Sequence, residues 1–420
     1  MNHRIAYVTG RFPPMRTSGT YRVEAVMKYL PAYGFDPEVV TLPNEWMTFQ
    51  ARRDHDGDVV PAIQPEAKSD DLVRYLSTLR YVNWAQRELM VPDLLAFWAR
   101  SAARVAADEL PEVELVYGTA PPFGAMVASH GLARRLGVPL VQEIRDPPSF
   151  DRALRARSAL FRKRMIGFER KYLTGADHVI TVTPRTRLRL LDLHRDLDPA
   201  RVHVVTNGYP DINVNLSLSD RDPGKFTIAY VGTFQGSVKA RESSLFTPAT
   251  LLPAISRLPE GKVEYRIVGR ATTRQRNALH DLDKNDTLEF KGVVSRGQAL
   301  AEIAAADIAV ILADDDDWWI GRKAFEYLRY AHTILAIVPP GDTTDLLAAH
   351  SRVDQVSPSD LSQLPGILQS RFDQWASGDW HRGPIPEGIQ TDETCVSGIA
   401  RILEKALGLE QSESGSPANS

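Results

Sequence analysis

Twelve short runs rich in β-branched residues alternate with helical patterns along the chain, and this alternation constrains its fold more than any other feature. The first set of six begins with RIAYVTG and the second with FTIAYVGTF. A polar segment around residue 215, punctuated by Pro223 and Gly224, separates the two sets. Strands that alternate with helices form right-handed βαβ units, whose parallel sheets are covered by helices on both faces. The sequence therefore predicts an α/β protein with two such sheets in series.

Length and composition agree with this prediction. A chain of 420 residues corresponds to two or three domains at about 150 residues each. Its 43% apolar residues, 25% charged residues and net charge of -3 are typical of a soluble globular protein and exclude a general nucleic-acid binder. The single Cys395 excludes an intramolecular disulfide. Because no signal peptide or long apolar run is seen either, we expect a cytoplasmic protein.

We expect two Rossmann-like, doubly wound domains that face each other across a cleft. The first domain holds an enlarged, aromatic-rich segment, whose rings are expected mostly in helix cores, with a minority at a specificity pocket. The predicted divisions are an N-terminal domain over 1–210 with its insertion over 44–110, a hinge linker over 211–224, a C-terminal domain over 225–390, a C-terminal helix over 391–409 and a disordered tail over 410–420.

The stretch from Ile308 to Leu328 combines an apolar strand, a loop and a helix, the order in which α/β proteins hold phosphorylated ligands. A helix that starts near Gly321 would place Lys323 and free backbone N–H groups in its first turn, facing an anion. Glu326 lies three residues further along the same face. This spacing predicts a cation for a diphosphate beside a carboxylate for a ribose diol; the alternative for Glu326 is a surface ion pair.

Four consecutive aspartates over 314–317 lie in the same loop. Carboxylates in such a cluster bind divalent cations in some enzymes, but they also occur in solvated loops beside basic residues such as Arg322 and Lys323. We expect the second arrangement and therefore no metal requirement.

Several segments, taken in order, resemble a known family. FPPMRTSGTYRVEAVMKYLPAYGFDPEVVT, VYGTAPPFGAMVASHGLARRLGVPLVQEIRD and GADHVITVT look like the acceptor domain of family-four glycosyltransferases of the GT-B fold. AYVGTF, YRIVGR, FKGVVSRGQALAEIAAADIAVIL and KAFEYLRYAHTILAIVPPGD look like their nucleotide-sugar domain. The resemblance implies a metal-independent, retaining glycosyltransferase that moves a sugar from a nucleotide diphosphate donor to a glycan, lipid-linked or small-molecule acceptor. It also implies a role in the biosynthesis of a polysaccharide, glycolipid or glycosylated metabolite.

The resemblance assigns roles to individual positions. In the first domain Ser18 and Gly19 match the loop that lies against the donor diphosphate. In the second, Gly232 and Lys239 match the positions that bind the donor phosphates, with Arg241 an equal candidate by charge. The nucleobase would be received by backbone near Gly269 and Val294, and Glu326 matches the glutamate that binds the ribose. The donor-binding set is thus Ser18, Gly19, Gly232, Lys239, Gly269, Val294, Lys323 and Glu326.

Two positions depart from the family pattern. The first glutamate of the family's pair falls at Trp318, and the arginine that many members carry after Gly232 is replaced by Thr233 and Phe234. These departures support an alternative, a catalytically silent GT-B protein that binds a nucleotide or glycan as a partner. An epimerase or phosphorylase of the same fold is a third possibility.

Two features concern the acceptor. Asp146, in the EIRD segment at the end of a strand, could orient an acceptor hydroxyl as a catalytic residue or cap the turn before Pro147. The segment 152–171 carries eight basic residues and one acidic residue among apolar ones. It is compatible with peripheral contact at the inner face of the cell membrane and with a solvated helix whose apolar face packs on the core.

Overall fold

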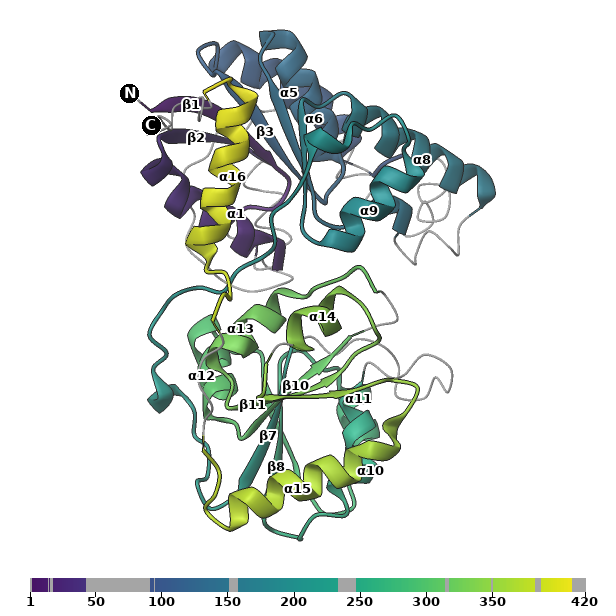
Figure 1. Ribbon diagram of the computed structural model, residues 1–420, viewed down its shortest axis with the longest axis vertical. Coiled ribbons are helices and arrows are strands. Elements are labelled where there is room, and N and C mark those ends of the chain that lie inside the picture. Colours follow the sequence, from purple (N-terminus) through teal and green to yellow (C-terminus); the bar gives the residue numbers. More distant parts are fainter. Residues whose placement is uncertain are drawn as a thin grey trace, which may run out of the picture. The chain divides into compact units, whose positions relative to one another are not determined.

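The structure is a computed structural model that describes residues 2–13, 15, 18–42, 91–93, 95–150, 158–232, 247–313, 317–348, 350–381 and 387–409. It divides into two compact units. The first consists of residues 1–207 and 392–420, and the second of residues 208–391. Each contains one six-stranded sheet, as the two sets of β-branched runs predict. Figure 1 shows helices flanking each of the two sheets.

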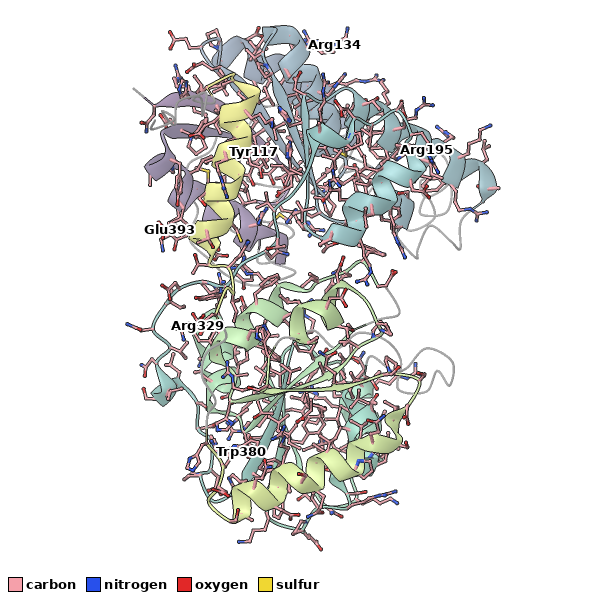
Figure 2. All side chains as sticks on the ribbon, viewed as in Figure 1. Tyr117, Arg134, Arg195, Arg329, Trp380 and Glu393 are labelled. Carbon is pink, nitrogen blue, oxygen red and sulfur yellow. The ribbon has the colours of Figure 1, made fainter. Side chains whose placement is uncertain are left out.

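Every paired strand of the first unit runs parallel to its neighbours, in the order β2-β1-β3-β4-β5-β6. Its strands are β1 (His3–Thr9), β2 (Phe35–Val40), β3 (Leu115–Ala120), β4 (Leu140–Ile144), β5 (His178–Thr181) and β6 (Val202–Val204). The order in which successive strands are added to the sheet reverses between β1 and β3, which makes the carboxyl ends of these two strands a topological switch point. Tyr117, labelled in Figure 2, lies within this sheet with its ring stacked on that of Tyr7 at 4.9 Å.

The described helices of the first unit include one from the far end of the sequence. They are α1 (Ser18–Tyr29), α5 (Ala96–Glu109), α6 (Gly124–Leu136), α8 (Ala159–Thr174), α9 (Pro184–Leu193) and α16 (Asp392–Ala406). Helix α16 lies beside α1 (Figure 1) and buries Cys395, Val396 and Ile399 in the core of the first unit. The predicted C-terminal helix therefore belongs to the first unit, although it follows the second in the sequence.

The second sheet has the order β12-β11-β10-β7-β8-β9 and is also parallel. Its strands are β7 (Phe226–Val231), β8 (Val263–Val268), β9 (Leu288–Gly292), β10 (Ile308–Leu312), β11 (Thr333–Ile337) and β12 (Val353–Val356). This is the doubly wound order of dinucleotide-binding domains, and its switch point lies between β7 and β10. The loops that follow these two strands are therefore the expected ligand-binding loops of the unit.

Strand β7 shows why the second sheet is covered on both faces. Phe226, Ile228 and Tyr230 pack in one apolar cluster, whereas Ala229 and Val231 pack in the other, as the two-residue period of a strand requires. The first cluster includes residues of α10 (Leu252–Ile255), α11 (Thr273–His280) and α15 (Leu364–Ala376). The second includes residues of α12 (Arg296–Ala305), α13 (Arg322–Tyr330) and α14 (Asp342–Ala348).

The polar segment that precedes β7, over 211–224, belongs to the second unit. Arg221 donates to both oxygens of Asp307, at 2.9 and 2.8 Å, and the buried guanidinium of Arg266 pairs with Asp220 at 3.0 Å. These ion pairs fasten the segment predicted as a hinge linker to the sheet of the second unit. Of the predicted insertion over 44–110, residues 44–90 lie outside the described residues, as does the tail over 410–420.

Candidate functional site

Two glycines shape the backbone at the carboxyl end of β7 and β8. Gly232 follows β7 with φ of +154°, and Gly269 follows β8 with φ of +136°. A Cβ atom on Gly269 would lie 2.0 Å from the carbonyl oxygen of Gly232, so the two loops touch through their backbones. The N–H of Gly269 donates to the carbonyl of Gly292 at 2.7 Å, which continues the contact to the end of β9. Only glycine fits these positions without displacing its neighbours.

Helix α13 begins next to this edge of the sheet. Its N-cap residue is Gly321, which offers no side chain to cap the first N–H groups. A Cβ at Gly321 would lie 2.3 Å from the Trp319 ring, so the absence of a side chain lets the indole lie against the helix start. Trp319 is 37% exposed, and its carbonyl accepts a hydrogen bond from Thr343 Oγ1. The loop before α13 is thus held in place from α14.

Lys323 points from the first turn of α13 to the end of β7. Its Nζ lies 1.8 Å from the position that a Cβ of Gly232 would occupy, and 5.4 Å from the centre of the Tyr230 ring. Within the described part of the chain, the ammonium group makes no hydrogen bond or ion pair. Burial lowers the pKa of Lys323 from 10.5 to about 8, although the negative charge of Glu326 opposes this shift. A partly buried cation at a helix N-terminus is a place for an anion.

This pKa leads to a pH prediction. An anion bound beside Lys323 favours its charged form, so binding of a nucleoside diphosphate should take up protons and weaken as pH rises through about 8. The pH dependence of folding stability without ligand has the opposite sign. Between pH about 8 and 10.5 the Lys323 side chain is protonated in the unfolded chain but not in the folded one, so the contribution of Lys323 to the free energy of unfolding rises with pH in that window. Calorimetry in buffers of different ionisation enthalpy measures the proton uptake. The variant Lys323→Arg should bind without this pH dependence, and an equal dependence in both proteins would contradict the assignment.

Glu326 lies one turn further along α13, and two arginines hold it. Arg296 Nη2 and Arg322 Nε each approach Glu326 Oε1 at 3.3 Å, and the carboxylate is 13% exposed. Among the described residues the second oxygen, Oε2, has no hydrogen-bond partner. The two arginines fix the orientation of the carboxylate, while one oxygen stays available to accept a hydrogen bond. An ion pair with Arg322, expected as the alternative role of Glu326, thus coexists with a free acceptor.

Trp318 occupies the position where the family pattern has its first glutamate. It is 5% exposed and therefore part of the packed interior of the loop, which brings no carboxylate there. The preceding residue, Asp317, is held through its backbone, because its carbonyl oxygen accepts a hydrogen bond from the N–H of Asp342 at 2.7 Å. The aspartates at 314–316 lie outside the described residues. Among the residues that are described, no group of three or more His, Cys, Asp or Glu side chains could hold a metal ion.

The other predicted donor-binding residues lie in different places. Val294 follows β9 and is partly buried against the core of the second unit, close in sequence to Gly292, which has a left-handed φ of +66°. Lys239 and Arg241 lie outside the described residues. The structure therefore brings together Gly232, Gly269, Lys323 and Glu326 in the second unit.

In the first unit, α1 begins at Ser18, so Ser18 and Gly19, which were predicted to lie in a loop, are the first residues of this helix. Gly19 lies in its first turn, where a Cβ would be 2.9 Å from Arg11 Cδ and 3.0 Å from Arg145 Nη1. Asp146 is exposed just beyond β4, and its negative charge acts on Arg11. Gly19, Asp146 and two arginines thus gather at the switch point of the first sheet.

Sequence reasoning missed Arg296, Tyr230 and Arg11. Arg296 begins α12 after a capping box of Ser295 and Gln298, a signal that marks the helix start but not the contact with a residue 30 positions later. Tyr230 reads as an ordinary strand residue, and Arg11 as an ordinary loop arginine. These contacts depend on strand order, which no local spacing reveals.

Comparison with known proteins agrees with this geometry. Residues 19–208 match the model of the glycosyl transferase 4-like domain. No curated protein matches the sequence. Among solved structures, sucrose-phosphate synthase from Thermosynechococcus elongatus has a TM-score of 0.61 at 15% identity, over 97% of both chains. The lipopolysaccharide outer core galactosyltransferase WaaB has a TM-score of 0.58 at 11% identity, over 96% of this chain and 99% of that one.

A further similar structure is that of a putative UDP-N-acetylglucosamine 2-epimerase from Listeria monocytogenes, with a TM-score of 0.56 at 11% identity over 98% of both chains. At such identities the likeness establishes the fold, which is GT-B, with two Rossmann-like units. The family match adds to this: residues 19–208 are similar to the glycosyl transferase 4-like domain, in agreement with a likeness to family-four GT-B glycosyltransferases. This confirms the resemblance seen in the sequence.

Proposed function

We propose that this protein transfers a sugar, with retention of anomeric configuration and without a metal ion, from a nucleoside diphosphate sugar to a glycan, lipid-linked or small-molecule acceptor. The observation that carries the proposal is the pairing of Lys323 with Gly232 at the switch point of the second sheet. The partly buried ammonium group of Lys323 lies at a helix N-terminus and beside Gly232, which carries no side chain. Such an arrangement can bind a diphosphate. Glu326, with one acceptor oxygen available, suits the ribose hydroxyls.

In this proposal the protein's main contribution is electrostatic. As the bond between the sugar and the diphosphate breaks, negative charge grows on the leaving phosphate, and Lys323 and the first turn of α13 stabilise it. The acceptor hydroxyl attacks from the same face, and its proton passes to the leaving diphosphate. The loss of one positive charge would therefore slow the chemical step as well as weaken donor binding.

Stereochemistry and metal use are tested together. The full-length protein, treated with chelator, is incubated with the nucleotide sugar that it binds, and the anomeric configuration of the transferred or hydrolysed sugar is read by proton NMR at early times. Retention in the presence of chelator supports the proposal. Inversion, or turnover that returns only with a divalent cation, contradicts it.

A catalytically silent nucleotide- or glycan-binding protein is the second candidate, and Trp318 is the observation that favours it. A buried indole occupies the position of the family's first glutamate, so the sugar would meet a different surface there. Binding of a nucleotide sugar without hydrolysis or transfer, in the protein that carries all of Lys323, Glu326 and Asp146, would select this candidate.

Peripheral membrane contact through 152–171 and a cytoplasmic location stay predictions. In α8 the apolar Phe161, Met165 and Phe168 are buried, whereas Leu160 is 68% exposed beside exposed basic residues. This burial supports the alternative of a solvated helix with its apolar face on the core. None of the described helices is long and apolar enough to cross a membrane.

Charge reversal on α8 separates these two roles. If the helix contacts an anionic surface, Lys163→Glu with Arg164→Glu should reduce co-sedimentation with phosphatidylserine vesicles severalfold at low salt, because each basic residue contributes about 1 kcal/mol near such a surface. Unchanged sedimentation, or none by the wild-type protein, would leave α8 as a solvated helix. The same reversal should leave nucleotide binding intact.

A further inference from the structure

Two arginine side chains converge at the switch point of the first sheet. A Cβ on Gly19 would lie 3.0 Å from Arg11 Nη1 and 3.0 Å from Arg145 Nη1, which puts the two guanidinium groups within about 6 Å of each other. The first comes from the loop after β1, and the second follows β4. Both lie over the first turn of α1, where the missing side chain of Gly19 leaves room for them.

Arg145 is fixed by carbonyl groups. Its guanidinium donates to the carbonyl oxygens of Gly19 at 3.2 Å, Pro121 at 3.0 Å and Ala120 at 3.4 Å, and the residue is 7% exposed. Carbonyl oxygens orient the group but do not neutralise it. The charge of the buried Glu143 carboxylate interacts with that of Arg145, but Glu143 makes its hydrogen bonds elsewhere, accepting from Nε and Nη2 of Arg22 at 3.1 and 2.8 Å and from Thr119.

Arg11 is the less restrained of the two. In the described part of the chain its guanidinium has no hydrogen bond and no ion pair. Burial lowers the pKa of Arg11, and the positive charge of Arg145 lowers it further, while Asp146 acts in the opposite direction. Two cations at the positive end of a helix repel one another, so a further anion bound between them would be stabilised there.

We propose that Arg11, Arg145 and the first turn of α1 bind an anionic group, a phosphate or a carboxylate, carried by the acceptor. Planar guanidinium groups match both anions through paired hydrogen bonds, and the helix N-terminus adds backbone donors. The inference rests on the proposed function for the word acceptor. The donor diphosphate has its own cation, Lys323, and its own helix N-terminus in the second unit. Asp146, exposed beside the pair, is placed to accept a hydroxyl of the same molecule.

The test uses orthophosphate as the probe and the full-length protein. Orthophosphate is titrated into protein saturated with the nucleoside diphosphate that it binds, so that the Lys323 site is filled. We expect binding in the wild type, weakening of about tenfold or more in Arg11→Gln, and partial recovery in Arg11→Lys. Arg195→Gln is the matched control, since Arg195 lies at the outside of the first unit (Figure 2), 82% exposed and paired with Asp192.

Stability measurements make the test specific. Because Arg11 makes no hydrogen bond or ion pair with a described acidic residue and lies beside Arg145, Arg11→Gln should keep or raise the melting temperature while anion binding is lost. A residue with only a structural role would show the opposite. Gly19→Ala, which retains both charges but crowds both side chains, should also weaken orthophosphate binding. Sodium acetate, titrated in the same way, distinguishes a carboxylate site from a phosphate site.

Two results would overturn the proposal: orthophosphate affinity unchanged in Arg11→Gln, or no orthophosphate binding once the nucleotide is bound, which would assign the pair to the donor diphosphate. If no nucleotide binds at all, the proposed function fails separately. The titration is then done on Lys323→Met, where the cation of the second unit is gone, and the comparison with Lys323→Met combined with Arg11→Gln decides the arginine pair alone.

Discussion

Replacing Lys323 with methionine is expected to weaken nucleoside diphosphate binding by about 2 kcal/mol, roughly 30-fold, because a charge-assisted contact with the phosphates is lost. The same change should not destabilise the protein. At pH 7 the ammonium group is charged in both the folded and the unfolded chain. Its lowered pKa means that the charged form is less stable in the folded protein than in the unfolded chain. Isothermal titration calorimetry and thermal unfolding on one preparation measure both effects.

The control for this variant is Lys262→Met, which removes an exposed lysine of the second unit. It should leave nucleotide affinity unchanged. Glu326→Ala should weaken the binding of nucleotides that carry ribose. Because it also removes a carboxylate from the buried Arg322, whose side chain is 6% exposed, we expect some loss of stability as well. Equal affinity for nucleotide in the wild type and Lys323→Met would remove Lys323 from the site.

The second large effect is on stability. Gly269→Ala should destabilise the protein by about 3 kcal/mol or more, because the new Cβ would lie 2.0 Å from the carbonyl oxygen and 2.6 Å from the carbonyl carbon of Gly232. These are backbone atoms, which no rotamer change moves. The φ of +136° adds strain for any residue with a side chain. Urea unfolding followed by circular dichroism measures the loss.

Two other glycines separate the causes. Gly261→Ala also has a positive φ, +71°, but no atom lies within 4 Å of its Cβ position, so it should cost about 1 kcal/mol. Gly366→Ala, inside α15 with open space around it, should be neutral or slightly stabilising. If Gly269→Ala cost no more than Gly261→Ala, the close approach of the two loops would be wrong.

Much of the fold could be predicted from the sequence because its signals are local. A buried parallel strand is a short run of β-branched residues, and each of the twelve runs forms a strand. Strand order was not open to the same reasoning. The unit against which α16 packs could not be predicted either, because Cys395, Val396 and Ile399 indicate an apolar helix face but not which unit covers it.

The site divides in the same way. Lys323 and Glu326 could be found because a helix places residues three apart on one face, and a glycine before the helix marks its start. The contact of Glu326 with Arg296, and the convergence of Arg11 with Arg145, join residues that are 30 and more positions apart. Such contacts arise from the packing of separate βα units, so a single sequence carries no local sign of them.

The most direct measurement of the central account is calorimetric titration of the purified, metal-free protein with UDP, GDP and TDP and their common sugar conjugates. The account predicts that one nucleotide sugar binds selectively, and that its affinity falls as pH rises through about 8 and falls again in Lys323→Met. Binding of none of these by folded protein, or binding that Lys323→Met leaves unchanged, would contradict it.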